Sequence, residues 1–121
     1  TSNEKKRISF CIDTCHIFVA GYDMRDINCV ENYFNLFDKL IGIDKLDLIH
    51  FNDSSKEFNS NVDRHANIGA GYIGNPDKGG NIEGLKRVYN YGKKFKIPMV
   101  LETEDIEPYV ELIKKNIWKF D

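Results

Sequence analysis

Three short apolar segments alternate with amphipathic segments along this chain, and this alternation constrains its fold more than any other feature. Runs of apolar residues predict strands at residues 8–12, 46–51 and 97–102. Apolar residues at helical spacing predict helices at residues 28–42, 82–95 and 108–117. Strands that alternate with helices favour a parallel sheet joined by right-handed crossovers, so the predicted fold class is α/β.

The composition is that of a soluble globular domain, and its charge balance narrows the routes to a binding partner. The 121 residues are 41% hydrophobic and 30% charged, with a formal net charge of −2 at pH 7. A chain with this balance does not attract nucleic acid through general positive charge. No apolar run approaches the ~20 residues that cross a bilayer, and the first residues lack the apolar core of a signal peptide.

The three cysteines are an odd number without the spacing of a disulfide framework or a structural zinc finger. We therefore expect an intracellular protein, in the cytoplasm or the nucleus, that is neither secreted nor bound to a membrane. Buried small apolar side chains are expected at Cys11, Cys15 and Cys29.

Residues that can bind metal lie at the carboxyl end of each predicted strand. Asp13 ends the first strand, His50 lies near the end of the second, and Glu102 ends the third. Parallel α/β sheets and barrels carry their active sites on this edge. Because side chains alternate along a strand, Asp13 shares a face with Cys11 while Ile12 faces the covering helices. The three strands therefore deliver two carboxylates and an imidazole to one place.

A second set of such residues includes His16 and part of the polar stretch 52–80. That stretch contains the tripeptide Asp63-Arg64-His65. In an extended backbone, Asp63 and His65 point the same way and can bind one cation together. Arg64 would then point the opposite way, where it is available to a phosphate.

Each of these residues also has a purely structural interpretation. A lone Asp at a strand end is most often a turn former or a helix cap, and the pair Asn52-Asp53 fits a turn after the second strand. A lone His is more often a hydrogen-bonded structural residue than a ligand. Taken together, all three histidines and three carboxylates at one edge of the sheet favour a hydrolytic site for Zn²⁺ or Mn²⁺.

Several short motifs stand in order along the chain: Cys11-Ile-Asp-Thr-Cys-His16, Ala20-Gly-Tyr-Asp23, His50-Phe-Asn-Asp53, Val62-Asp-Arg-His65 with Asn67-Ile-Gly69, and Leu101-Glu-Thr103. In this order and spacing they resemble the endonuclease IV family, metal-dependent apurinic/apyrimidinic (AP) endonucleases built on a TIM barrel. The resemblance implies that residues 1–121 are the C-terminal portion of an AP endonuclease barrel domain. They would form its last three βα units, strands six to eight. A TIM barrel needs ~250 residues, so the missing N-terminal half is an implied partner.

The resemblance also implies a site of three zinc ions. Together with a bridging glutamate from an earlier strand, one zinc is held by side chains that match Asp13, His50 and Glu102. The ligands of a second zinc match His16, Asp63 and His65. The third zinc depends on residues from the absent strands, so this chain is expected to hold one to two zinc ions, with Mn²⁺ as an alternative.

The implied reaction is hydrolysis of the phosphodiester immediately 5′ to an abasic site in duplex DNA, a step of base excision repair. The catalytic residues that the resemblance implies are Asp13, His50 and Glu102, with Glu102 a metal ligand first. The loop 54–74 resembles a DNA-contacting loop of the family, with expected phosphate contacts from Lys56, Asn59, Asn61 and Arg64. Two bound Zn²⁺ ions would add four positive charges to the formal −2 at this DNA-facing edge.

Two alternatives stay open. A sugar isomerase on the same kind of barrel also places carboxylates and histidines around two metals, although Asp63-Arg64-His65 favours the nuclease. A non-catalytic barrel fragment could instead bind metal or a partner without turnover. Because three βα units cannot close a barrel, we expect the 121-residue chain to be inactive alone and its unpaired strand edges to favour association.

Overall fold

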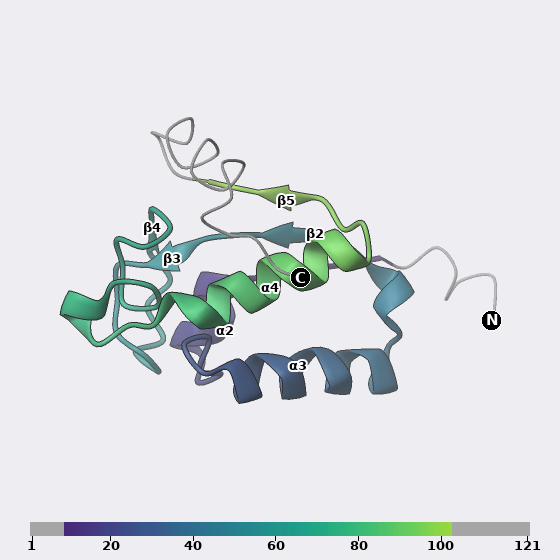
Figure 1. Cartoon of the computed structure of the whole chain (residues 1–121), viewed down its shortest axis with the longest axis horizontal. Helices are drawn as coiled ribbons and strands as arrows, with labels where there is room; N and C mark the ends of the chain where they lie inside the picture. Colours follow the sequence, from purple (N-terminus) through teal and green to yellow (C-terminus); the bar gives the residue numbers. More distant parts are fainter. Residues whose placement is uncertain (1–8, 103–121) are drawn as a thin grey trace.

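A three-stranded parallel sheet is the centre of the computed structural model, which describes residues 9–102 (Figure 1). The strands β1 (Phe10–Asp13), β2 (Leu46–His50) and β5 (Met99–Val100) lie in the order β1-β2-β5. Both neighbouring pairs are parallel, as the alternation of strands and helices predicts. The three predicted strands are confirmed within the described part of the chain. The predicted helix 108–117 lies outside the described residues.

Strand β5 is shorter than predicted, and Pro98 stands immediately before it. A proline has no N–H to donate to a sheet, so it is tolerated at the start of a strand. Its carbonyl still accepts a hydrogen bond from the Ile49 N–H at 2.9 Å, and the Phe51 N–H donates to Val100 O at 2.8 Å. The contact between β2 and β5 therefore extends beyond the two residues of the strand.

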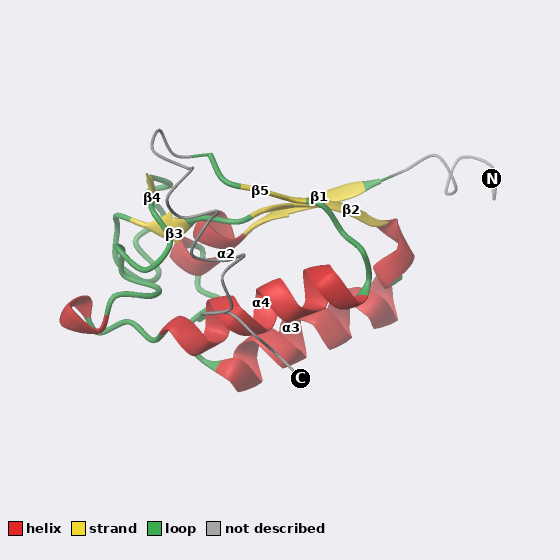
Figure 2. Ribbon diagram, turned by 45° about the horizontal axis from the view of Figure 1, so that its top comes forward, coloured by secondary structure: helices red, strands yellow, loops and turns green. Residues whose placement is uncertain are grey.

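Helices α3 (Ile27–Leu40) and α4 (Ile82–Lys94) cover the same face of the sheet (Figure 2). Each makes a crossover between neighbouring parallel strands, α3 from β1 to β2 and α4 from β2 to β5. Two further short 3₁₀ helices are η1 (Ile43–Lys45) and η2 (Pro76–Lys78). Within residues 9–102, no helix is both long enough and apolar enough to span a bilayer.

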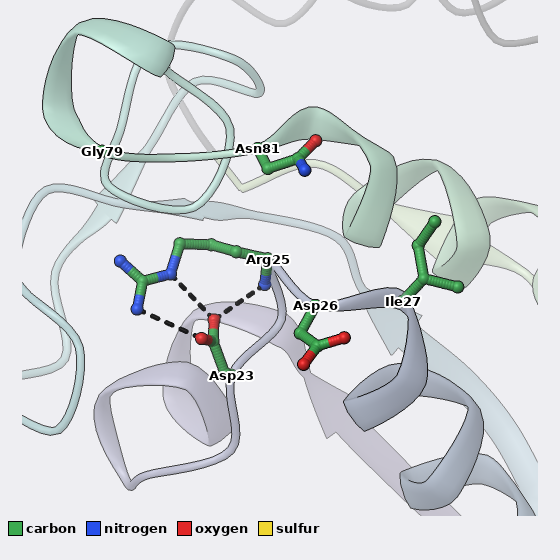
Figure 3. A pocket seen from close by; sticks show the side chains of 6 residues that line it. All are labelled: Asp23, Arg25, Asp26, Ile27, Gly79 and Asn81. Carbon is green, nitrogen blue, oxygen red and sulfur yellow. Dashed lines mark hydrogen bonds and ion pairs between the residues drawn. The ribbon is translucent and has the colours of Figure 1, made fainter.

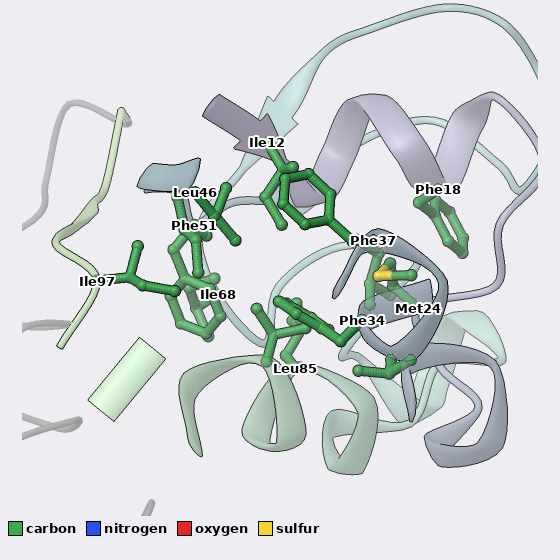
Figure 4. Packing of buried hydrophobic residues seen from close by; sticks show 14 of the residues in the cluster. Ile12, Phe18, Met24, Phe34, Phe37, Leu46, Phe51, Ile68, Leu85 and Ile97 are labelled. Carbon is green, nitrogen blue, oxygen red and sulfur yellow. The ribbon is translucent and has the colours of Figure 1, made fainter. Parts of the chain in front are cut away.

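The hydrophobic core lies between the sheet and these two helices (Figure 4). Ile12 and Ile49, which are partners in the register of β1 and β2, are buried. They lie in one cluster with buried residues of the helices such as Phe34 and Leu85. Burying each large apolar side chain contributes roughly 1.5–3 kcal/mol, so this layer holds the helices on the sheet.

The opposite face of the sheet carries Cys11, Leu48 and Val100. Cys11 is exposed, Leu48 is half-buried and the Val100 side chain is 42% exposed. In a closed TIM barrel this face is the filled interior. The prediction that all three cysteines are buried is therefore wrong for Cys11, which lies on this open face, and only Cys15 is fully buried.

The start of α3 differs from the prediction. Asp26 is its N-cap, and the Asp26 carboxylate accepts a hydrogen bond from the Asn28 N–H at 2.8 Å. For a helix that starts at residue 28, the sequence pattern predicts Asn28 as the cap, with Glu31 three residues later; this prediction is wrong, because Asn28 lies inside α3. Glu31 instead accepts hydrogen bonds from Arg87 Nη1 at 2.6 Å and from the Tyr91 hydroxyl at 2.9 Å, and so joins α3 to α4. Asp and Asn are equally good caps, so the sequence alone cannot choose between two candidates two residues apart.

A short helix that was not predicted, α2 (Thr14–Val19), follows β1 directly. Asp13 is its N-cap, and Asp13 Oδ1 accepts a hydrogen bond from the His16 N–H at 3.1 Å. Phe18 and Val19 are buried in the core. Six residues are too few for apolar periodicity to reveal a helix.

Arg25 holds the turn between α2 and α3 (Figure 3). Its guanidinium donates to the Asp23 carboxylate, from Nε at 2.8 Å and from Nη2 at 3.1 Å. It also lies 5.3 Å from the ring centroids of both Phe18 and Phe58. Burial raises the pKa of Asp23, but the bonds with Arg25 outweigh this effect and hold the pKa below its ordinary value.

The polar stretch 52–80, which was expected to be a loop, contains a small antiparallel pair of strands. These are β3 (Asp53–Ser54) and β4 (His65–Ala66), with Ser54 opposite His65. The pair lies at the carboxyl end of β2 (Figure 1). It therefore places part of the loop next to the edge where the predicted ligands gather.

Lys96, two residues after the end of α4, has a left-handed backbone conformation with φ of +56°, and its replacement by glycine is predicted to stabilise the protein. Glycine adopts this conformation without the cost that a Cβ imposes. Lys96→Gly should therefore raise the free energy of unfolding by about 1 kcal/mol in urea denaturation. The matched change Lys93→Gly, inside α4, should lower it by about 0.5–1 kcal/mol. A less stable Lys96→Gly variant would contradict this account of the helix end.

Candidate metal centre

The register of the parallel sheet brings the first predicted ligand set together. Asp13 of β1 is the partner of His50 in β2, His50 is the partner of Val100 in β5, and Glu102 follows two residues later. His50 Nδ1 lies 2.5 Å from Glu102 Oε1 and 3.9 Å from Asp13 Oδ2. One ligand atom from each of the three side chains lies within 4.8 Å of the others. The structure thus forms the three-stranded cluster that strand alternation predicts.

The second predicted ligand set lies beside Asp13. Asp63 Oδ2 is 3.5 Å from His16 Nδ1, and Asp63 Oδ1 is 3.6 Å from His65 Nε2. His65 Nε2 also lies 3.1 Å from Asp13 Oδ2, so the two sets touch. Asp63 and His65 point the same way, as an extended backbone predicts. The His16 side chain is 66% exposed, which makes this set the more open of the two.

Cys15 is a neighbour of this cluster that sequence reasoning did not include. Its ligand atom lies within 4.8 Å of those of Asp13, Asp63 and His65. The thiol is fully buried and donates a hydrogen bond to Arg64 O at 3.3 Å. Burial raises the pKa of Cys15 to about 12, so the thiol keeps its proton at neutral pH. Cys15 therefore holds the peptide between Asp63 and His65 in place.

The chemistry of the two sets fits a divalent cation. The Asp13 carboxylate lies near that of Asp63 in one group of residues and near that of Glu102 in the other, and neighbouring carboxylates repel each other when ionised. Imidazole nitrogens stand between them. Carboxylate oxygen and imidazole nitrogen are ligand types for Zn²⁺ and Mn²⁺, and a cation between them would neutralise the repulsion.

Asp53 is fully buried and organises the loop that follows β3. Its two carboxylate oxygens accept hydrogen bonds at 2.7–3.1 Å from five backbone N–H groups, those of Ser54, Gly69, Gly71, Ile73 and Gly74. Burial raises the pKa of Asp53, and the hydrogen bonds from the N–H groups act against this. The interpretation of Asn52-Asp53 as simple turn formers is therefore wrong.

The Asp53 loop supports His65, one of the candidate metal ligands. Strand β3 begins at Asp53 and pairs with β4, where His65 lies opposite Ser54. The Ser55 N–H adds a hydrogen bond to Arg64 O at 2.9 Å. The loop also packs closely against β3 at Gly71. A side chain at this position would not fit, because its Cβ would lie only 2.2 Å from Ser54 O. The pairing of β3 with β4 and the hydrogen bond from Ser55 therefore hold the backbone at His65 in place.

The four residues predicted to contact DNA all lie on the segment between β3 and β4. Asn59 and Asn61 have φ of +61° and +59°, a conformation that Asn tolerates better than most residues. The Asn61 N–H donates to Val19 O at 2.9 Å, which docks the segment on the end of α2. Lys56 and Arg64 are exposed. Contact of these residues with DNA stays a prediction.

Comparisons with known proteins confirm the resemblance. Residues 2–78 match the model of the xylose isomerase-like TIM-barrel family. The chain is 44% identical over 100 residues to a protein named endonuclease 4 from Acanthamoeba polyphaga mimivirus, and 43% identical over 109 residues to one from Alkaliphilus oremlandii. These alignments cover 83% and 89% of this chain, but 30% and 36% of the relatives.

The crystal structure of endonuclease IV from Thermus thermophilus is similar to the structure described above. The TM-score is 0.66 at 32% sequence identity, and the match covers 89% of this chain and 37% of that chain. The chain therefore spans about a third of the length of these relatives. The described residues form part of a TIM barrel.

Replacing Asp53 should loosen the loop that it organises. Asp53→Asn exchanges one acceptor oxygen for an NH₂ group that faces N–H donors. We expect the free energy of unfolding to fall by about 2–4 kcal/mol, because several buried N–H groups lose their acceptor. Hydrogen exchange of the Gly69, Gly71 and Gly74 amides should accelerate. The same change at exposed Asp77 should alter stability by less than about 0.5 kcal/mol. Unchanged amide exchange in Asp53→Asn would contradict this role.

Proposed function

Because the chain belongs to the xylose isomerase-like TIM-barrel family, we propose that it supplies the carboxyl-terminal metal ligands of an endonuclease IV-type DNA-repair enzyme. One observation carries the proposal: Asp13, His50 and Glu102 converge from the ends of three parallel strands. This is the edge on which TIM barrels carry their active sites. The relatives named endonuclease 4 support the nuclease over other activities of this family.

The proposed substrate is duplex DNA that contains an abasic site, and the proposed reaction is hydrolysis of the phosphodiester on its 5′ side. The products would be a 3′-hydroxyl and a 5′-deoxyribose phosphate. The proposed place of action is the cytoplasm or nucleus, where DNA is repaired. The chain spans about a third of its relatives, so the activity is proposed for the chain together with the rest of a barrel.

The proposed metal is zinc. Its ligands would be Asp13, His50 and Glu102 for one ion, and His16, Asp63 and His65 for a second. When bound, zinc supplies Lewis acidity towards the phosphate and activates water at neutral pH. Glu102 would act as a metal ligand first, with a role in proton transfer secondary to that.

The exposed residues of the segment between β3 and β4 would position the DNA. Lys56 and Arg64 supply positive charge, and Asn59 and Asn61 supply amide groups. Such contacts to phosphate fix the register of a duplex without reading its sequence. They fit an enzyme that recognises a damaged site in any sequence.

A hybrid barrel tests the proposed function. The part of Thermus thermophilus endonuclease IV that this chain does not match, which the resemblance implies is the amino-terminal part, is joined to residues 1–121. We expect the hybrid to incise a duplex 5′ to a single abasic site in a zinc-dependent manner, and the 121-residue chain alone to be inactive. His65→Ala in the hybrid should lower the rate of incision by more than the ~10–100-fold loss that is typical when a residue next to a metal ligand is replaced. The control variant Lys39→Ala, at an exposed position of α3, should leave the rate of incision unchanged.

The sugar-isomerase alternative gives the opposite result in the same experiment. A folded hybrid that interconverts an aldose and a ketose, and leaves abasic-site DNA intact, would overturn the proposed function. Folding of the hybrid is checked by circular dichroism.

A further inference from the structure

A polar link that is buried at two of its three residues joins the carboxyl ends of all three parallel strands. It consists of Thr14 after β1, Asn52 after β2 and Glu102 after β5. The Thr14 and Asn52 side chains are 0% and 1% exposed. Thr14 Oγ1 donates to Asn52 O at 2.6 Å and accepts from the Asn52 N–H at 2.9 Å. The backbone of Asn52 is thereby fixed to the end of β1.

The side-chain amide of Asn52 completes the link to the third strand. Its Oδ1 accepts a hydrogen bond from the Glu102 N–H at 3.1 Å. Its Nδ2 donates to Glu102 Oε1 at 3.2 Å. A backbone N–H can bond only to the oxygen of the amide, so the NH₂ group must face the Glu102 carboxylate. The orientation of Asn52 is therefore determined by its partners.

The bond from Asn52 falls on an oxygen that belongs to the candidate metal centre. Glu102 Oε1 also lies 2.5 Å from His50 Nδ1. Glu102 lies two residues beyond the end of β5, and its side chain is 32% exposed. Without the hydrogen bond from the Asn52 amide, the Glu102 side chain could adopt more rotamers, and more entropy would be lost when it bound a metal.

We propose that Asn52 is a positioning residue that orients the Glu102 carboxylate for metal binding, with Thr14 fixing Asn52 to the first strand. This inference rests on the proposed function, because it assigns Asn52 to the same metal centre. An NH₂ donor on a ligand carboxylate decides which oxygen faces the cation, and groups that orient ligands in this way contribute to metal affinity.

Asn52→Asp is the sharpest variant because it keeps the size of the side chain. An aspartate can still accept the hydrogen bond from the Glu102 N–H. It loses the donor, however, and places a carboxylate oxygen against Glu102 Oε1. The expected effect is therefore on the orientation of Glu102 more than on the backbone.

The test measures zinc binding by the full 121-residue chain after removal of metal with a chelator. Competition with a chromophoric chelator gives the dissociation constants. The unchanged chain should bind one to two zinc ions, and Asn52→Asp should bind its Glu102-linked ion ~10–100-fold more weakly. The same change at exposed Asn35 on α3 adds the same charge and should leave the affinity unchanged.

Two further readouts separate positioning from a merely structural role. The visible absorption band of the Co²⁺-loaded chain should change in Asn52→Asp and stay the same in Asn35→Asp. Thr14→Val should weaken zinc binding, and Thr14→Ser, which keeps the hydroxyl, should restore it. This pair decides the question if Asn52→Asp does not fold, and equal affinities in the pair would then overturn the proposal.

The remaining outcomes distinguish this inference from the proposed function. If folded Asn52→Asp binds zinc as tightly as the unchanged chain, with the same Co²⁺ spectrum, the role of Asn52 is refuted and the proposed metal centre stands. If the unchanged chain is folded and binds no zinc, both are refuted.

Discussion

The parallel register of β1 and β2 is the constraint on which the candidate metal centre depends. It places Asp13 beside His50, and the same alternation sends Ile12 and Ile49 to the opposite face, under α3 and α4. A slip of one residue would exchange the two faces, so that carboxylates would enter the core and isoleucines would face the open edge. Burial of the core therefore enforces the ligand geometry.

Two adjacent buried residues, Asn52 and Asp53, form hydrogen bonds with different parts of the carboxyl edge of the sheet. Asn52 reaches across to Glu102, and Asp53 gathers backbone N–H groups of the loop that leads into α4. Buried polar groups must be hydrogen-bonded, so each residue fixes whatever supplies its partners. Cys15 adds a hydrogen bond to the carbonyl of Arg64, which lies between the candidate ligands Asp63 and His65. The candidate ligands of the loop and of the strands are thus supported by hydrogen bonds of buried residues.

Much of this arrangement was predictable because it follows from periodicity. Strand alternation placed Asp13 and His50 on one face, and the extended backbone placed Asp63 and His65 together. Helix α2 was not predictable, because six residues show no period. The role of Asp53 was not predictable either, because four of its five partners are backbone N–H groups 16–21 residues along the chain, which leave no mark in the side-chain pattern. The contact between the Cys15 thiol and Arg64 O was not predictable for the same reason, because it joins residues that are 49 positions apart in the sequence.

X-ray absorption at the zinc edge of the zinc-loaded 121-residue chain tests the central claim most directly. The claim is that carboxylates and imidazoles from three strand ends and one loop form a metal centre. It predicts bound zinc with a shell of nitrogen and oxygen ligands at about 2.0–2.2 Å. A shell dominated by sulfur at about 2.3 Å, or the absence of stoichiometric zinc in the folded chain, would contradict it.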